Sequence, residues 1–206
     1  MPRALLFLLL SLLLTGLALL VHEPDADGRL AQEALRMQHA VDADAQRLAT
    51  LCEEQLGALN KLGDDGWMRL NAQPLQQRNR QDGTTLIGLR GDSVVCWSGE
   101  VLWTPNELRG DTAAHLTIGE ATSLHAMFRM GDVEMHAVQP LWLSPPIENR
   151  YLKHGFHPSL KAPAGLLAEP GPGTGPTVRD AKGVALFRLG WRDGAMEVGD
   201  WIQVRF

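Results

Sequence analysis

The sequence predicts an α+β protein in which a membrane helix is followed by a long helix packed on an antiparallel sheet of about five or six strands. Three observations predict this class. An uncharged apolar run opens the chain, a helical apolar repeat follows, and strand-like segments joined by Gly-Asp pairs come after it. The expected organisation is a membrane anchor at 1–22, the long helix at 28–62 and an α+β domain at 63–206.

The apolar run covers residues 4–21, reads ALLFLLLSLLLTGLALLV and contains no charged side chain. A bilayer core of about 30 Å needs about 20 such residues in a helix, and flanking residues can supply the difference. Arg3 precedes the run and acidic residues follow it, which favours export of the rest of the chain. A cleaved signal peptide is the alternative, although Leu19, Leu20 and Val21 stand where small residues are expected. Both interpretations export the remaining chain.

The long helix is predicted from good helix formers and from apolar residues at steps of three and four. These residues are Leu30, Ala34, Met37, Val41, Leu48, Leu51, Leu59 and Leu62. The sequence Gly63-Asp64-Asp65-Gly66 is expected to end the helix. The stripe can pair with a second copy, which predicts a homodimer through the long helix, or pack on the chain's own sheet. Residues 67–83 are polar and are expected to form a loop or a short helix.

Strand-like segments dominate the rest of the chain. Two hairpins are expected, with turns at Gly91-Asp92 and Gly131-Asp132, and tight turns imply antiparallel pairing. A third candidate hairpin turns at Arg192-Asp193-Gly194 and returns through 201–206. The predicted strands are Thr84–Arg90, Ser93–Ser98, His125–Met130, Val133–Trp142, 184–191 and 201–206. A short helix is expected from Ile147, after Pro145 and Pro146.

The composition and the motifs exclude several classes of function. The net charge is −5 and no basic block suggests nucleic acid. There is no Gly-x-Ser-x-Gly, no His-Glu-x-x-His and no P-loop. His154 and His157 are expected to form a surface pair, because no Cys or carboxylate lies at ligand spacing nearby. His115, His125 and His136 are scattered and are expected to be polar core or surface residues. No catalytic residue, metal or cofactor is therefore predicted.

The two cysteines, Cys52 and Cys96, would face an oxidising compartment if the chain is exported. They can form one disulfide, or they can be two small buried apolar side chains. A single pair of cysteines does not distinguish these states. The tryptophans likewise leave two interpretations open, because most fall in or beside predicted strands, where an indole can pack in a core or wall a ligand pocket.

Two short motifs resemble a known family. They are Cys96-Trp97-Ser98 and Pro146-Ile147-Glu148-Asn149-Arg150-Tyr151-Leu152, the second followed by Phe156. Their order and spacing resemble the N-terminal extracytoplasmic sensor region of membrane two-component sensor histidine kinases, particularly a Bacteroidetes group. The segment VRDAKGVALFRL resembles a strand of the same region. Gly99-Glu100 and Pro145-Pro146 depart from the usual residues at their positions.

The resemblance implies a PAS/Cache-like periplasmic sensor domain on the bacterial inner membrane, held by a single-pass anchor at 4–21. The implied signal is an unknown small molecule or envelope protein. Trp97, Ser98, Glu148 and Asn149 carry the motifs and are the candidate ligand-binding residues, and structural roles in turns are the alternative. No phosphoacceptor or ATP-binding motif occurs in these residues, so we expect no enzymatic activity of this chain. An anchored envelope binding or scaffold protein without signalling is the alternative function.

Overall fold

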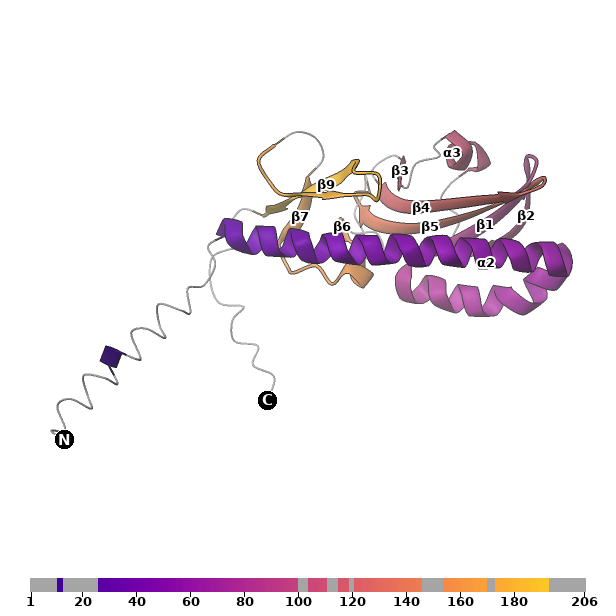
Figure 1. Ribbon diagram of the computed structural model, residues 1–206, viewed down its shortest axis with the longest axis horizontal. Coiled ribbons are helices and arrows are strands. Elements are labelled where there is room, and N and C mark those ends of the chain that lie inside the picture. Colours follow the sequence, from indigo (N-terminus) through magenta and orange to yellow (C-terminus); the bar gives the residue numbers. More distant parts are fainter. Residues whose placement is uncertain are drawn as a thin grey trace.

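A computed structural model of the chain describes residues 11–12, 26–99, 104–110, 115–118, 121–145, 154–169 and 173–192. A long helical element, α2 (Ala26–Asp82), lies along two antiparallel sheets (Figure 1). The predicted α+β class with a long helix and antiparallel strands is confirmed. Most of the predicted anchor at 4–21 and the predicted strand at 201–206 lie outside the described residues. Among the helices that the structure describes, none is both long and apolar enough to cross a membrane.

The element α2 consists of two helices joined by a sharp turn at Gly63. Gly63 has φ 69° and ψ 173°, a left-handed conformation that suits a residue without a Cβ atom. Figure 1 shows the second helix returning alongside the first. The Trp67 side chain is fully buried and donates a hydrogen bond from Nε1 to Gln55 Oε1 at 3.0 Å, which fastens the two helices together. The predicted break at Gly63 is therefore confirmed, but the following polar residues form a helix up to Asp82.

The larger sheet has the strand order β2-β1-β5-β4-β3, and β6 pairs with the end of β5. Its strands are β1 (Thr85–Arg90), β2 (Ser93–Ser98), β3 (His115–Ile118), β4 (Ala121–Met130), β5 (Val133–Leu143) and β6 (Gly155–Phe156). The pairs β1–β2 and β4–β5 are the two predicted hairpins, and Gly91 and Gly131 in their turns have positive φ. The two hairpins meet where β5 pairs with β1. The short elements α3 (Pro105–Gly110) and η1 (Pro158–Leu160) complete this part.

A second, smaller sheet was not predicted. It has the order β7-β9-β8, with β7 (Leu166–Glu169), β8 (Thr177–Arg179) and β9 (Ala185–Trp191). The strand expected at 184–191 is present as β9, but it pairs with β7 and β8 and does not join the larger sheet. The strands β7 and β8 are too short to show an alternating pattern in the sequence. The expectation of a single sheet was therefore wrong.

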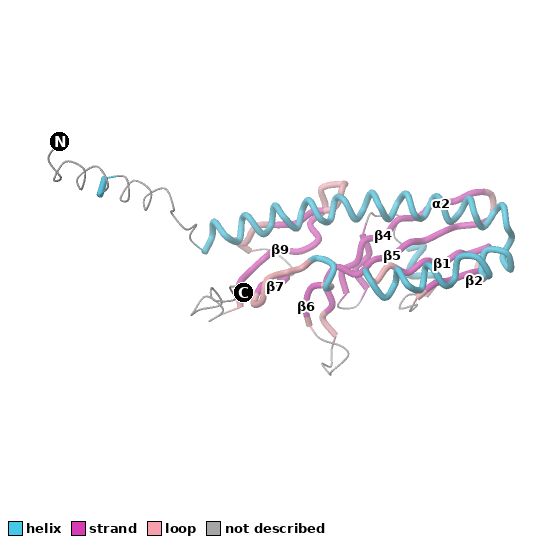
Figure 2. Tube along the Cα trace, turned by 90° about the horizontal axis from the view of Figure 1, so that it is seen from below, coloured by secondary structure: helices cyan, strands magenta, loops and turns pink. Residues whose placement is uncertain are grey.

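The apolar stripe of α2 is buried against both sheets. Figures 1 and 2 show the small sheet along the N-terminal part of the first helix and the large sheet along the rest of it. The buried residues of this helix are Leu30, Ala34, Met37, Val41, Leu48, Leu51, Cys52, Leu56 and Leu59. Leu62, expected in the same stripe, is 39% exposed. The stripe thus packs within the chain, and a homodimer through the long helix stays a prediction.

The large sheet has two buried faces. Met135 and Ala137 of β5 belong to the apolar cluster that includes α2. Their neighbour Val138 points the other way, because side chains alternate along a strand. It packs with Ile87 of β1 and Leu108 of α3. The sheet therefore separates the core under α2 from a second buried layer on its other face.

Candidate functional site

Of the four candidate ligand-binding residues, Trp97 and Ser98 are described, and neither lines a cavity reported below. Ser98 is 4% exposed, and its hydroxyl accepts a hydrogen bond from the Leu86 amide at 3.2 Å. It therefore stabilises the β1–β2 hairpin. Trp97 is 50% exposed. Glu148 and Asn149 lie outside the described residues.

Cys52 on α2 and Cys96 on β2 are buried thiols and form no disulfide. The Cys52 thiol donates a hydrogen bond to the Met135 carbonyl at 2.9 Å. The Cys96 sulfur packs over Gly88, where an added Cβ atom would lie 2.5 Å from it. Burial raises the pKa of both thiols to about 12, so they are protonated at neutral pH. Of the two states that the sequence leaves open, a disulfide or two small buried side chains, the structure has the buried side chains.

A cavity of about 320 Å³ lies where the large sheet meets the small one. We call it the junction cavity. Its lining comes from the end of β5, from β6 and η1, from the loop after η1 and from β7. On one wall Trp142 and Phe156 meet edge to face, with ring centroids 4.7 Å apart, a stable arrangement of aromatic rings. Lys161 and Arg192, both exposed, bring positive charge to the lining.

Both histidines of the expected surface pair line this cavity. Burial lowers the pKa of His157, although Asp82 and Asp44 act in the opposite direction. His157 is therefore neutral at pH 7. Its Nδ1 accepts a hydrogen bond from the Ser159 amide at 3.3 Å, so the proton of the neutral ring lies on Nε2. The ring is thus held in one orientation, with His154 as its neighbour in the lining.

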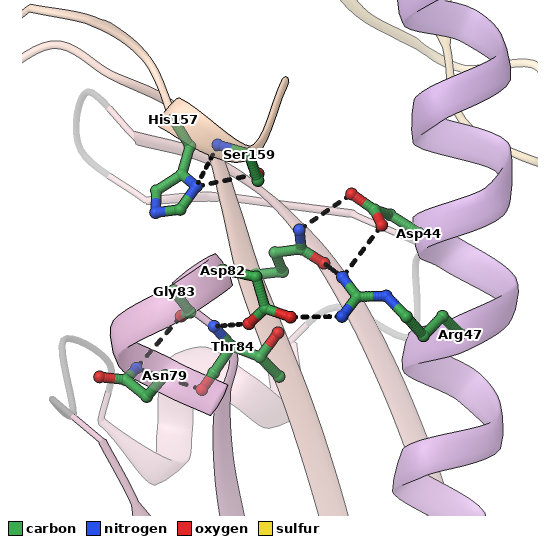
Figure 3. Close-up of polar contacts among 9 residues, drawn as sticks. Asp44, Arg47, Asn79, Asp82, Gly83, Thr84, His157 and Ser159 are labelled. Atoms are coloured by element: carbon green, nitrogen blue, oxygen red, sulfur yellow. Dashed lines mark hydrogen bonds and ion pairs between the residues drawn. The ribbon is translucent and has the colours of Figure 1, made fainter. Parts of the chain in front are cut away.

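A polar cluster of Asp44, Arg47 and Asp82 lies near His157 (Figure 3), and Gln139 joins it through hydrogen bonds. Arg47, in the first helix of α2, forms ion pairs with Asp82 at the end of the second helix and with Asp44 at 2.9 Å. Arg47 also donates to Gln139 Oε1 of β5 at 2.9 Å, and the Gln139 amide donates to Asp44 at 2.9 Å. The cluster therefore joins both helices of α2 to the central strand of the large sheet.

The charge of Asp82 depends on this cluster. Burial opposes its ionisation, but hydrogen bonds from Thr84 and Arg47 outweigh burial and hold the pKa of Asp82 below its ordinary value. The Thr84 amide donates to Asp82 Oδ1 at 3.0 Å. The same two carboxylates, Asp82 and Asp44, raise the pKa of Arg47 against the effect of burial. The ion pair is therefore fully charged at neutral pH.

The turn between α2 and β1 connects the junction cavity to the polar cluster. Gly83 in this turn has φ 72°, and an added Cβ atom would lie 2.7 Å from His157 Nε2 and 2.9 Å from Pro140. The Asn79 amide donates to the carbonyls of Gly83 and Thr84 at 3.3 and 3.1 Å, which holds the turn in place (Figure 3). The absence of a side chain at Gly83 therefore lets His157 pack against the turn, next to Asp82, whose carboxylate pairs with Arg47.

A second connection joins the cavity to α2 through Arg36. Its guanidinium donates to the Leu160 carbonyl at 2.9 Å and to the Lys161 carbonyl at 3.4 Å. Glu33 pairs with the same guanidinium at 2.7 Å. Lys161 has φ 49°, the one positive φ among the described residues other than glycine. Such a backbone costs free energy and persists where the surroundings hold it.

The structure also brings together two histidines that the sequence analysis treated separately. His125 Nε2 and His136 Nδ1 lie 3.0 Å apart in the β4–β5 hairpin, and the side chains are 5% and 1% exposed. Glu134 Oε2 lies 3.6 Å from His136 Nε2, and Glu134 also pairs with Arg129. In the neutral pair one ring donates and the other accepts, so the two rings share a proton. Among the described residues, no group of three or more His, Cys, Asp or Glu is placed to bind a metal.

A signal for this pair was present in the sequence. A two-residue turn at Gly131-Asp132 pairs Met130 with Val133. The same register pairs His125 with Val138, and Met127 with His136. The two histidines are then diagonal neighbours on one face, within reach of each other. The predicted hairpin therefore already implies that His125 and His136 are neighbours, although neither histidine alone indicates a pair.

Another hollow, of about 600 Å³, lies between α2 and β4. Small and apolar side chains such as Ala45, Ala49 and Phe128 form most of its lining. Asp42, Gln46 and His125 are its polar members. This hollow is therefore mostly an apolar space. The junction cavity, in contrast, has aromatic walls, positive charge and two connections to α2.

The junction cavity is therefore the candidate functional site. Its described lining includes no Ser, Thr, Cys, Asp or Glu that could serve as a nucleophile or a carboxylate base. The arrangement suits binding, and Lys161 in the lining is held to α2 through Arg36. No protein-family model, no curated protein and no solved structure matches this chain.

Proposed function

We propose that this chain is a membrane-anchored, PAS/Cache-like sensor domain of a two-component system, with its bulk in the periplasm of a bacterium. The observation that carries the proposal is the course of α2. It lies along both sheets, contacts the Lys161 backbone in the lining of the junction cavity through Arg36, and begins shortly after the apolar run at 4–21. A signal bound in the cavity would thus bias the position of the helix that leads to the membrane.

The geometry of the helix supports this coupling. Arg36 and Arg47 are separated by 11 positions, about three helical turns, so they lie on one face. A helix rises 1.5 Å per residue and is stiff, so a displacement at these two points reaches its N-terminal end. A ligand shifts an equilibrium only by binding one arrangement better than another. We infer that the two arrangements differ in how the cavity segment sits on this face of α2.

Export is tested with a reporter that works only outside the cytoplasm. Alkaline phosphatase fused after Phe206 is expected to be active in cells that make the full chain. The same fusion without residues 4–21 is expected to be inactive, because the apolar run is the export signal. Activity of both fusions, or of neither, would contradict the membrane topology.

Signalling is tested with a chimera in which residues 1–206 precede the second membrane helix and kinase half of a sensor kinase of known output. His157→Ala and Arg47→Ala, which cut the connection at its two ends, are expected to change the basal output. Arg80→Ala, an exposed arginine at the end of the second helix, serves as the matched control and should leave the output unchanged. Equal output of all four chimeras would instead favour an anchored binding or scaffold protein without signalling.

A further inference from the structure

We propose that the junction cavity binds a small organic carboxylate with an apolar body. This inference rests on the proposed function, for which it names the class of signal. It follows from three properties of the described lining: the sign of its charge, its aromatic wall and the fixed backbone of one cationic residue.

The described lining of the cavity carries positive charge. The cations Lys161 and Arg192 belong to it, and no Asp or Glu does so among the described residues. The Arg192 backbone is anchored by a hydrogen bond from its amide to the Gly165 carbonyl at 2.8 Å. An anion is the ligand that such a lining binds best, because charge-assisted hydrogen bonds are stronger than neutral ones.

Several arginines elsewhere in the described chain form an ion pair with a carboxylate, and these two cations differ from them. The ion pairs are Arg36 with Glu33, Arg47 with Asp44 and Asp82, Arg90 with Asp64, Arg129 with Glu134, and Arg188 with Glu169. No such ion pair involves Lys161 or Arg192 in the part of the chain that the structure describes. The two cations at the cavity therefore remain available to a ligand.

Another wall of the cavity is aromatic and uncharged. Trp142 and Phe156 form it as an edge-to-face pair, and Phe187 behind them supports Phe156 with a ring centroid 5.3 Å away. Leu166, 5% exposed, also lines the cavity. Pockets of about 300 Å³ or more accept small organic molecules, and apolar walls bind the body of the ligand while a few polar groups orient it. An inorganic anion would leave this wall without contacts.

The position of Lys161 is fixed before any ligand arrives. Its backbone has φ 49°, and its carbonyl and that of Leu160 accept hydrogen bonds from Arg36. A cation whose backbone is already held binds an anion with a smaller ordering cost. The same hydrogen bonds would carry the effect of the bound carboxylate to α2.

The test uses the full chain in lipid nanodiscs and isothermal calorimetry at neutral pH. The probes are benzoate, phenylacetate and hexanoate, with benzyl alcohol as the neutral counterpart and inorganic phosphate as the anion without an apolar body. At least one carboxylate is expected to bind, and benzyl alcohol and phosphate should bind far more weakly. Lys161→Gln and Arg192→Gln should each weaken carboxylate binding roughly tenfold, the loss of one charge-assisted hydrogen bond.

Lys61→Gln is the matched control, because Lys61 is an exposed lysine of α2 outside the cavity lining. It should bind the carboxylate like the unchanged chain. The proposal is overturned if no carboxylate binds, if phosphate binds as tightly as the carboxylates, or if Lys161→Gln and Arg192→Gln both bind unchanged. The kinase chimera described above needs no ligand, so a failure of carboxylate binding leaves the signalling proposal to its own test.

Discussion

The large sheet and the small sheet lie along the same helix, but different kinds of contact hold them to it. Leu59 of α2 packs against β1 at Gly88, and Cys52 lies on β5 through its bond to Met135. The small sheet has apolar contacts too, but its hydrogen bonds to Gln38 are exposed, whereas the bonds from α2 to the large sheet at Met135 and Gln139 are buried or partly buried. Gln38 donates to the Arg179 carbonyl at 2.9 Å and accepts from the Arg179 amide at 2.8 Å. Polar bonds of this kind can exchange partners at little cost, so the small sheet is the part that can adjust on α2.

The largest expected effect is in the packing of the large sheet. Leu59, 1% exposed, lies between α2 and β1, and Leu59→Ala should lower the free energy of unfolding by about 3 kcal/mol, through lost burial and a cavity. Urea denaturation of the full chain in detergent measures this loss. Leu70→Ala, at a side chain that is 64% exposed, is the matched control and should change stability by less than about 0.5 kcal/mol. Equal losses would mean that the large sheet is not the fixed part.

The polar cluster should show the next largest effect. Arg47→Ala leaves Asp82 partly buried without its cation, and we expect a loss of about 2 kcal/mol, less than for a fully buried pair because Arg47 is 36% exposed. Asp82→Asn should cost less, since it removes the carboxylate itself. Urea denaturation of both variants and of the control Arg80→Ala checks this order. A smaller loss for Arg47→Ala than for Asp82→Asn would contradict it.

Removing the hydrogen bonds from Gln38 to the small sheet should lower the free energy of unfolding by about 1 kcal/mol. Gln38→Ala deletes both hydrogen bonds to Arg179, and exposed hydrogen bonds each contribute little. The effect should be local, so trypsin should cleave after Arg179 faster than in the unchanged chain. Gln76→Ala, at an exposed position of the second helix, should leave the cleavage rate unchanged. An unchanged rate in Gln38→Ala would show that Gln38 does not hold the small sheet.

The smallest expected effect is on the pH dependence of stability. Burial lowers the pKa of His157 below its unfolded value of 6.5, so the unfolded chain binds a proton more readily. The stability from neutral His157 is therefore present above that value and is lost as the pH falls through the folded pKa. His157→Gln should flatten this part of the profile in urea unfolding, whereas His39→Gln on the surface should keep it. The stability from ionised Asp82 is lost separately, as the pH falls below the unfolded pKa of 3.8.

Much of the fold was predictable because its signals are local. The first helix and the hairpins at Gly91 and Gly131 follow from apolar periodicity and turn residues. The sequence predicts only a loop or short helix for the second helix of α2, because this segment is polar and has Trp67 and Leu75 as its buried residues. The small sheet is not predicted because its short strands carry no clear pattern of their own and form only by pairing with neighbouring strands.

The candidate site was predictable only in part. The two histidines of the segment at 154–157 were noticed, but their role depends on Gly83 and Asp82, which are distant in the sequence. Ser98 was selected by resemblance, and its hydroxyl turns out to serve the β1–β2 hairpin. Sequence patterns report neighbours along an element, whereas this cavity forms between elements.

Hydrogen exchange of the full chain, followed by mass spectrometry, tests the central claim most directly. The claim is that α2 is fixed to the large sheet and adjustable on the small one. Amides of β8 and β9 should exchange by local opening, roughly thirtyfold faster than those of β1 and β5, a difference of about 2 kcal/mol. If both sheets exchange at the same rate, the two sheets and α2 open as one unit, and the proposed adjustment between cavity and helix is contradicted.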